Sequence, residues 1–490
     1  MSSRPVWETI PEMVLSTADR FGDAEAIVDG DLRLSFAEVV DRVRKAAGAY
    51  IEAGVGKGDR VAIWAPNSAE WIIAAFGLLT AGGVLVPVNT RFKAAEAGDI
   101  IGRSGAKLLL VQQNFLGLDF DFSGPADIPV IDLKSDFLAS GTPAERKASG
   151  DDVADIIFTS GTTGRPKGVM MAHAPTLRLY AEWNELAGTR AGDRYLIANP
   201  FFHIFGYKAG CIASMIRGMT ILPVPVFDID HVLDLVERER VTVLPGPPTV
   251  YHSLLAARRA GGRDLSTLRV AVTGAADIPV ELIRQIREEL PFRSIMTGYG
   301  LTEAGTITAS RQGDSFEDIA TTVGTPCEGF ELRIAADGEI LARGYGVMRG
   351  YLDDPAATAE AIDADGWLHT GDLGAIDRAG RLKIIGRKKD MFIVGGFNAY
   401  PAEIEGIMVG HPQVGQVAVV GVPDERLGEV GVAFVVPRPG QALDPDELVA
   451  WCRDHMANFK VPRTIRIVDA LPLNPTGKVM KFQLRAELAG

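Results

Sequence analysis

Apolar positions alternate between two patterns through most of the chain. Short apolar runs, such as residues 60–64 and 84–88, have the length and side-chain character of buried strands. The longer stretches 69–81 and 94–104 lie between such runs and space their apolar residues as helices do. Because strands and helices take turns, the pattern predicts an α/β fold with mainly parallel sheets covered by helices.

The same alternation continues further along, with predicted strands at 107–111, 241–244 and 268–273 and a predicted helix at 279–290. The pattern changes in the last third of the chain. Residues 331–343 are predicted to form a hairpin turning at Asp337 and Gly338, and residues 375–385 a second hairpin. Beyond these, the sequence predicts helices at 402–408 and 444–456 and strands at 414–420 and 431–436.

These patterns divide the chain into two parts. Its 490 residues exceed the size at which one hydrophobic core keeps growing, so at least two domains are expected. We predict a large multi-layer α/β N-terminal domain over 1–387, with parallel-rich sheets and helices, and a small α+β C-terminal domain over 388–490. No long linker rich in proline or serine separates them, so a short hinge is expected.

Composition narrows the classes of partner. A net charge of −13 disfavours nucleic acid or an anionic membrane held by bulk electrostatics. The three cysteines form no CxxC pair, which favours a reducing cytoplasm. The apolar stretch 71–88 is interrupted by Gly82, Gly83 and Pro87, so it predicts a buried helix and strand rather than an integral membrane segment.

A glycine- and threonine-rich segment, TSGTTGRPKG at 159–168, follows the apolar run 156–158. Its glycines let backbone amides turn toward an anion, and Lys167 adds a positive charge. The spacing differs from that of the Walker A loop, and a flexible surface turn is the alternative. The predicted phosphate-binding residues are Thr159, Ser160, Gly161, Thr162, Thr163, Gly164 and Lys167.

This loop resembles the signature of the adenylate-forming superfamily, which contains acyl-CoA synthetases, adenylation domains and luciferases. Four further motifs follow in the family's order, namely GYGLTE at 298–303, TGD at 370–372, GRKKD at 386–390 and NPTGK at 474–478. The resemblance covers essentially the whole chain. It implies a large N-terminal domain, a small mobile C-terminal domain and an active site between them. It also implies an acid–CoA ligase that uses ATP, Mg²⁺ and coenzyme A.

The resemblance implies a role for each motif residue. Glu303 would be the Mg²⁺ ligand, because a hard cation on phosphates takes only one or two protein carboxylates. Asp372 and Arg387 would bind the ribose hydroxyls, since a carboxylate accepts two hydrogen bonds from a diol. Lys478 would bridge the carboxylate and the α-phosphate. The remaining residues are Thr302 at the α-phosphate, Tyr299 with Gly298 and Gly300 at the adenine, and Gly274, Ala275 and Ala276 beside adenine and acyl group.

Thioester formation would use another face of the small domain. The resemblance implies a large rotation about Lys389, after which Gly395, Gly396 and Phe397 would line the pantetheine tunnel. The residues that hold the CoA phosphates stay open among Arg438, Lys460, Arg463 and others.

The segment FFHIFGY at 201–207 matches the part of the family that borders the acyl group. His203 either gates this pocket or is a structural core histidine. No aspartate stands in the segment, which disfavours an amino acid substrate, and Trp183, His203, Ile204, Phe205 and Ala276 suit an apolar acid. Phe397 replaces the glutamate that many ligases pair with this histidine, which weakens the prediction of a His203–carboxylate dyad.

Three segments, FFHIFGYKAG, VTVLPGPPTVYHSLL and GGFNAYPAEIE, are similar to the branch of ligases that activates a bicyclic indanedione propanoate during steroid-ring breakdown. A medium- or long-chain fatty acid and an aryl acid are the alternatives. Two other classes also stay open: a stand-alone adenylation enzyme that loads a carrier protein, and a degenerate nucleotide-binding scaffold. Retention of Glu303, Asp372, Arg387 and Lys478 argues against the scaffold. The oligomeric state, including a homodimer, is left open.

Overall fold

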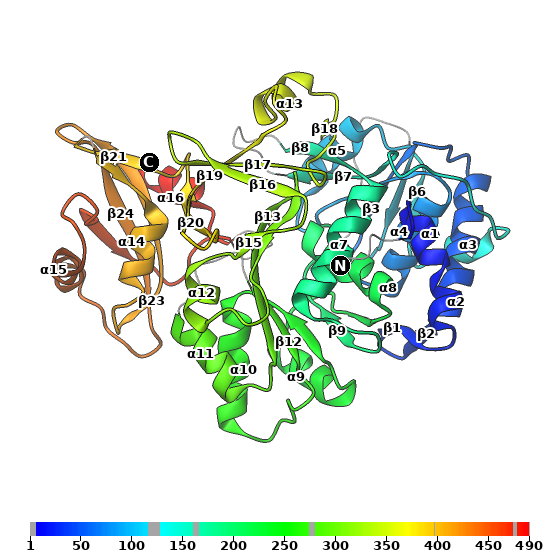
Figure 1. Cartoon of the computed structure of the whole chain (residues 1–490), viewed down its shortest axis with the longest axis horizontal. Helices are drawn as coiled ribbons and strands as arrows, with labels where there is room; N and C mark the ends of the chain where they lie inside the picture. Colours follow the sequence, from blue (N-terminus) through cyan, green and yellow to red (C-terminus); the bar gives the residue numbers. More distant parts are fainter. Residues whose placement is uncertain are drawn as a thin grey trace.

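The computed structural model describes residues 6–115, 128–159, 166–273, 280–395, 397–473 and 478–489. These residues form four sheets. Figure 1 shows the last of them, coloured orange to red, beside the larger N-terminal part, with the hairpin of β19 (Leu368–Ile376) and β20 (Leu382–Arg387) between the two. We refer to the segment from β21 (Phe392–Val394) to α16 (Lys481–Ala489) as the C-terminal unit.

Two large sheets form the N-terminal part, and their central strands are parallel. The nine-stranded sheet has the order β15 (Thr325–Pro326), β14 (Gly305–Ala309), β13 (Ser294–Leu301), β12 (Val270–Thr273), β11 (Val243–Pro245), β9 (Arg194–Ile197), β10 (Thr220–Pro223), β1 (Glu25–Asp29) and β2 (Leu32–Ser35). The seven-stranded sheet has the order β18 (Gly350–Tyr351), β8 (Lys167–Ala172), β7 (Val153–Thr159), β4 (Val84–Pro87), β3 (Arg60–Trp64), β5 (Leu108–Val111) and β6 (Val130–Asp132).

Helices pack around these sheets. One large apolar cluster includes residues from both sheets and from the helices α3 (Phe36–Glu52), α4 (Ala69–Thr80) and α7 (His173–Ala187). The helices of this part are α1 (Ile10–Leu15), α2 (Thr17–Phe21), α3 (Phe36–Glu52), α4 (Ala69–Thr80), α5 (Ala94–Ser104), α6 (Phe137–Ser140), α7 (His173–Ala187), the π-helix η1 (Phe205–Ile212), α8 (Ala213–Arg217), α9 (Ile229–Arg238), α10 (Pro248–Ala260), α11 (Val280–Glu289), α12 (Phe316–Thr321) and α13 (Pro355–Ala361).

A third, four-stranded antiparallel sheet consists of β16 (Phe330–Ile334), β17 (Glu339–Gly344), β19 (Leu368–Ile376) and β20 (Leu382–Arg387). It confirms both predicted hairpins. Gly338 and Gly380 turn them with φ angles of +86° and +81°, a backbone region that glycine enters without a steric penalty.

The C-terminal unit has its own sheet and its own apolar clusters. Its remaining elements are β22 (Phe397–Ala399), α14 (Pro401–Met408), β23 (Val414–Asp424), β24 (Gly428–Pro437), α15 (Pro445–His455) and β25 (Thr464–Ile467). The predicted strands and helices of both parts are confirmed, with ends that shift by a few residues. The strand β25, which pairs in parallel with β24, was not predicted from the sequence.

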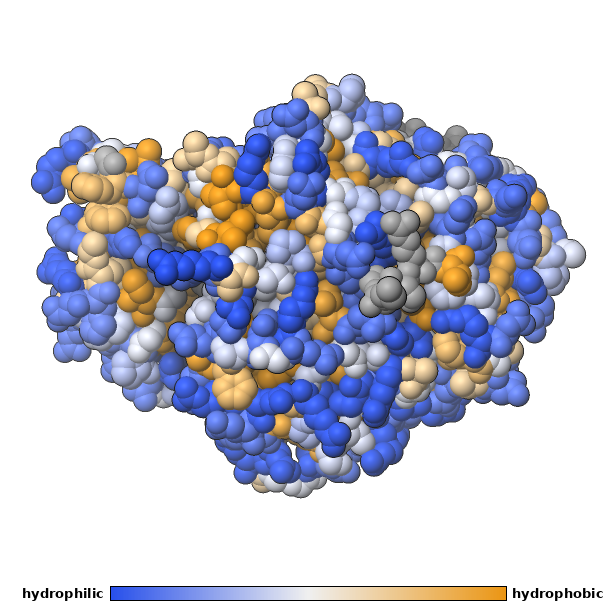
Figure 2. Space-filling model, viewed as in Figure 1, coloured by the Kyte–Doolittle hydropathy of each residue, from blue (hydrophilic) through white to orange (hydrophobic). Residues whose placement is uncertain are grey.

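The apolar stretch 71–88 folds as predicted. Ser68 caps α4 by accepting a hydrogen bond from the Trp71 amide, and Gly82, with φ of +82°, turns the chain into β4. Among the helices of the described ranges, none combines the length and apolar character that crossing a membrane requires. The face in Figure 2 is mainly hydrophilic, with an apolar patch where β19 adjoins the C-terminal unit.

Candidate active site

Three predicted nucleotide-binding residues meet where β13, β19 and β20 approach one another. The Tyr299 hydroxyl donates a hydrogen bond of 2.6 Å to Oδ2 of Asp372. The other carboxylate oxygen of Asp372 lies 3.3 Å from Nε of Arg387, its partner across the β19–β20 hairpin. Both oxygens therefore have fixed partners, and Asp372 is a buried anion held in one orientation.

The glycines on either side of Tyr299 are required by the close approach of β14. A Cβ atom on Gly300 would lie 2.1 Å from the Gly305 carbonyl oxygen, and one on Gly298 would lie 2.8 Å from the Thr308 carbonyl oxygen. The β13–β14 register also shifts between Tyr299 and Gly300. The GYG motif is therefore needed to form this bulged hairpin, which aims Tyr299 at Asp372.

The turn before Asp372 depends on a residue that the sequence did not reveal. Glu339 is buried on β17 and accepts a hydrogen bond of 2.9 Å from the Gly371 amide. Lys388 makes two contacts at this turn. Its Nζ lies 3.1 Å from Oε2 of Glu339, and its amide donates a hydrogen bond to the Gly371 carbonyl. Gly371 has a φ of +70° and is suited to this tight turn.

Glu303, the predicted Mg²⁺ ligand, lies in the turn after β13. Burial raises the pKa of its carboxyl group, and the Tyr351 hydroxyl donates a 3.0 Å hydrogen bond to it. No lysine or arginine of the described ranges forms an ion pair with this carboxylate. A partly buried carboxylate without a paired cation fits a hard divalent metal, so Glu303 is compatible with the predicted role.

Tyr351 also connects Glu303 to the phosphate loop. The ammonium group of Lys167 lies 4.9 Å from the centre of the Tyr351 ring. Lys167 itself pairs with Thr159 across β7 and β8, so the two ends of the loop are held together. Tyr351 was missed because an isolated tyrosine on a two-residue strand carries no motif.

Several predicted residues lie outside the described ranges. They are Ser160, Gly161, Thr162, Thr163 and Gly164 of the phosphate loop, Gly274, Ala275 and Ala276, and Gly396. Thr302, by contrast, is described and is buried beside Glu303.

Lys478 of the C-terminal unit faces the N-terminal part. The residue as a whole is exposed, whereas partial desolvation and the positive charge of Arg387 lower the pKa of its ammonium group and the negative charge of Asp372 raises it. Burial and the charge of Lys478 together lower the pKa of His203 to about 4. The charge of Lys478 therefore interacts with Asp372, a predicted ribose-binding residue, and with His203, a predicted acyl-pocket residue.

The predicted acyl segment leads into η1. The Phe205 amide donates a hydrogen bond of 3.2 Å to Nδ1 of His203, so this ring nitrogen is occupied as an acceptor. Ile204 is buried, and Phe205 is partly buried at the start of η1. Trp183 stacks on Tyr195 with ring centres 6.2 Å apart and is buried in the core. Its part in an acyl pocket stays a prediction.

The hinge and CoA-tunnel residues lie at the edge of the C-terminal unit. Burial and nearby Arg387 lower the pKa of Lys389. Its neighbour Asp390 forms a 3.2 Å ion pair with Arg485. Gly395 has a φ of +57°, and Phe397 exposes 60% of its surface while stacking on Phe459 at 5.1 Å.

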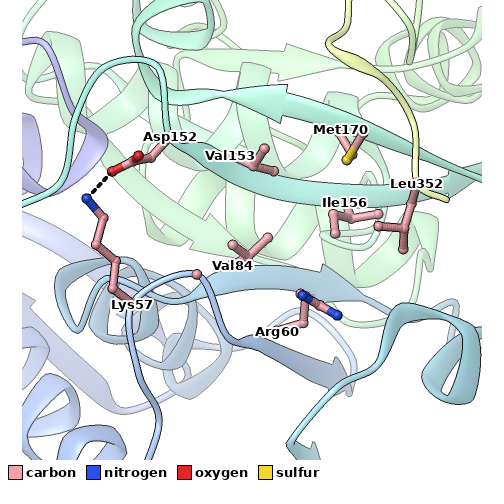
Figure 3. Close-up of a pocket in the computed structure, with 9 residues that line it drawn as sticks. Lys57, Arg60, Val84, Asp152, Val153, Ile156, Met170 and Leu352 are labelled. Atoms are coloured by element: carbon pink, nitrogen blue, oxygen red, sulfur yellow. Dashed lines mark ion pairs between the residues drawn. The ribbon is translucent and has the colours of Figure 1, made fainter. Parts of the chain in front are cut away.

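A cavity of about 240 Å³ lies elsewhere, against β3, β4, β7 and β8 (Figure 3). Its floor is apolar, and Lys57 and Asp152 form a 2.8 Å ion pair at its rim. None of the described candidate residues for ATP, metal, acid or CoA lines it. The catalytic proposal therefore rests on the convergence around Asp372 rather than on this cavity.

Comparison with known proteins agrees with these observations. The family model described as AMP-binding enzyme matches residues 15–352, and the AMP-binding enzyme C-terminal domain matches residues 403–478.

Two curated relatives carry the same name, 3-[(3aS,4S,7aS)-7a-methyl-1,5-dioxo-octahydro-1H-inden-4-yl]propanoyl:CoA ligase. The one from Rhodococcus jostii (strain RHA1) is 47% identical over 99% of this chain and 100% of its own length. The one from Mycobacterium tuberculosis (strain ATCC 25618 / H37Rv) is 49% identical over 97% and 98%. Among solved structures, the anthranilate CoA ligase AuaEII in complex with anthranoyl-AMP aligns with a TM-score of 0.90 and 27% identity, covering 99% of this chain and 98% of that one.

Proposed function

The chain belongs to the family of AMP-binding enzymes and is an AMP-forming acid–CoA ligase, and we propose that its acid is the indanedione propanoate named for its two relatives. Identity of 47% over essentially both full lengths supports this substrate. The apolar character of Ile204 and Phe205 also supports it, because such side chains suit an apolar ring system better than a second charged group on the acid.

The reaction proceeds in two steps, and the enzymes of this class use ATP, Mg²⁺ and coenzyme A. In the first, a carboxylate oxygen of the acid attacks the α-phosphorus of ATP, and the bond to pyrophosphate breaks. In the second, the CoA sulfur attacks the acyl carbonyl carbon, its proton is lost and AMP departs. The first step needs alignment of two anions and neutralisation of charge on phosphate oxygens.

Asp372, Arg387 and Tyr299 would hold the ribose and adenine, and Glu303 would hold Mg²⁺, which when bound neutralises phosphate charge. Lys478 would bridge the acid's carboxylate and the α-phosphate. The observation that carries this assignment is the convergence of Tyr299 and Arg387 on the two oxygens of Asp372. The effect of Asp372 on the pKa of Lys478, and that of Lys478 on the pKa of His203, agree with it.

For the second step, residues 388–490 would rotate about Lys389. Glycine and aromatic residues of the β21–β22 hairpin, Gly395 and Phe397 among the described ones, would then border the pantetheine arm. The exposed Phe397–Phe459 stack supports this, because it leaves an aromatic surface available for a second conformation.

A direct assay tests the proposal. The purified chain is incubated with ATP, Mg²⁺, CoA and one of four acids: the indanedione propanoate, octanoate, palmitate or benzoate. We expect AMP and acyl-CoA in equal amounts, with the highest kcat/KM for the indanedione acid. A higher kcat/KM for any other acid would reject the substrate, and ADP as product would reject the reaction. Acyl transfer to a carrier protein but not to free CoA would favour the stand-alone adenylation enzyme.

We also infer a cytoplasmic location and leave a homodimer as a hypothesis. Cys211, Cys327 and Cys452 are all unpaired thiols, which supports a reducing compartment. Cell fractionation and light scattering of the purified chain test the two points separately.

A further inference from the structure

A charged pair lies in the N-terminal core, remote from solvent. Nζ of Lys208 is 2.8 Å from Oδ1 of Asp155, and both side chains are fully buried. Within the described residues, neither the ammonium group nor the carboxylate has a further hydrogen-bond partner. Burial lowers the pKa of Lys208 and raises that of Asp155, as expected for charges removed from water.

Stability alone does not explain this pair. The desolvation of two buried charges can exceed their mutual attraction, and apolar side chains of similar volume often give an equally stable or more stable protein. Aromatic side chains lie near the pair: Tyr207 precedes Lys208 on η1 and packs edge-on against Trp71, and Asp155 acts electrostatically on Tyr207 and Tyr180.

The position of the pair links the two halves of the active site. Asp155 is on β7, which runs between β4 and β8 and ends at Thr159, where the phosphate loop begins. Lys208 is on η1, whose N-terminal end follows His203 and Ile204 of the acyl segment. The ion pair therefore ties the acyl-side helix to the phosphate-side strand.

The acyl segment needs such an anchor at its second end. At its first end, Asn67 accepts a hydrogen bond of 2.8 Å from the Phe201 amide and donates to the Asn199 carbonyl. At the other end the chain is a π-helix, a conformation that is rare and frequently found at functional sites. Lys208 is the charged residue that connects η1 to the rigid sheet.

We propose that Lys208 and Asp155 are positioning residues that fix the acid's carboxylate at reacting distance from the α-phosphate of ATP. The proposal rests on the adenylating function described above. It predicts that only adenylation is affected. Once the acyl-adenylate has formed, a covalent bond joins the acyl group to AMP, so the Lys208–Asp155 pair no longer sets the distance between them.

The test replaces both charges by apolar side chains of similar size, Asp155→Leu with Lys208→Met. Acid-dependent exchange of pyrophosphate into ATP reports adenylation, and thioester formation from supplied acyl-AMP reports the second step. We expect adenylation kcat to fall about tenfold or more, with KM for ATP and the rate of the second step within about twofold of the parent. The melting temperature should equal or exceed that of the parent.

A matched control removes an exposed ion pair of similar geometry, Arg259→Met with Glu289→Leu, where the charged groups lie 2.6 Å apart on α10 and α11. It should leave both steps unchanged. The single variant Lys208→Met should reproduce the adenylation defect of the double variant, because either change breaks the same pair.

Equal loss in both steps, or adenylation at the parental rate, would overturn the positioning role. So would failure of both the double variant and Lys208→Met to fold, because the core would then need the charges for stability. If the parent itself exchanges no pyrophosphate with any acid, the proposed function fails instead.

Discussion

The region around Asp372 and the C-terminal unit present their predicted site residues in opposite ways. Asp372 is buried, and its two oxygens are held by Tyr299 and Arg387. Phe397 is largely exposed and contacts Phe459 on the surface of its own unit. One region is arranged before substrate arrives, whereas the other keeps an aromatic face in solvent.

This difference follows from the chemistry that each region serves. Groups that hold ATP and neutralise developing charge are most effective when they need no reorganisation during the reaction. In the proposed mechanism the C-terminal unit takes part in both steps, so a given face is needed only part of the time. The predictions below separate the two regions by asking which half-reaction each residue affects.

The largest effect is expected at Lys478. Lys478→Ala should lower acyl-adenylate formation by about 100- to 1,000-fold, because a charge aimed at the reacting oxygens is lost. Thioester formation from supplied acyl-AMP should change by less than about threefold. Pyrophosphate exchange and a coupled thioester assay measure the two steps. Lys383→Ala, which removes an exposed lysine of β20, serves as the control. Equal loss in both assays would show that Lys478 does not act selectively in adenylation.

Asp372→Asn should have the next largest effect. The amide replaces a charged acceptor that also orients Tyr299 and Arg387, and hydrogen bonds to charged groups contribute about 1.5–3 kcal/mol each. We therefore expect kcat/KM for ATP to fall about 10- to 100-fold. Tyr299→Phe keeps the ring and removes only the hydroxyl, so it should be clearly milder. If Asp372→Asn changed only KM for the acid, Asp372 would contribute to binding the acid rather than ATP, and the prediction would be wrong.

Phe397→Ala tests the exposed face. We expect KM for CoA to rise about fivefold to tenfold, since an aromatic contact surface is lost, while pyrophosphate exchange stays at the parental rate. Initial rates at varied CoA concentration measure this. The comparison between the two regions would fail if adenylation fell as much as thioester formation did.

The smallest effect concerns His203 and pH. Burial and Lys478 bring its pKa from 6.5 to about 4, so the unfolded chain binds more protons than the folded one between these values. The free energy of unfolding should therefore fall as pH drops from 6.5 toward 4, by at most about 1.4 kcal/mol per pH unit from this group. His203→Gln should flatten the slope of urea midpoint against pH.

A second histidine also contributes to the pH dependence in that experiment. Burial lowers the pKa of His173 to about 4 as well, so some slope should persist in the His203 variant. An unchanged slope in His203→Gln would show that His203 is solvated in the folded protein.

Local sequence signals predicted most of the fold and the adenosine end of the site. Runs of apolar residues located β3, α4, β4 and α5, and glycines located the hairpin turns, because both signals act over a few neighbouring residues. Spaced motifs located Tyr299, Asp372 and Arg387, which the structure brings into contact.

Other features had no local signal. Glu339 and Tyr351 support the TGD turn and Glu303 through contacts 32 and 48 residues away in the chain. The Lys208–Asp155 pair joins residues on η1 and β7. The neighbouring sequence of a single glutamate, tyrosine or lysine is the same whether the side chain is solvated at the surface or buried in such a contact.

The sequence by itself determined the order of strands and helices and the motifs that carry the reaction, since backbone conformation and glycine-dependent turns follow from neighbouring side chains. Only the tertiary structure decided which charges lose their water and which partners they meet there. That depends on distant segments packing together, and it makes Asp372 a fixed acceptor, Glu303 a partly buried carboxylate and Lys208 the buried partner of Asp155.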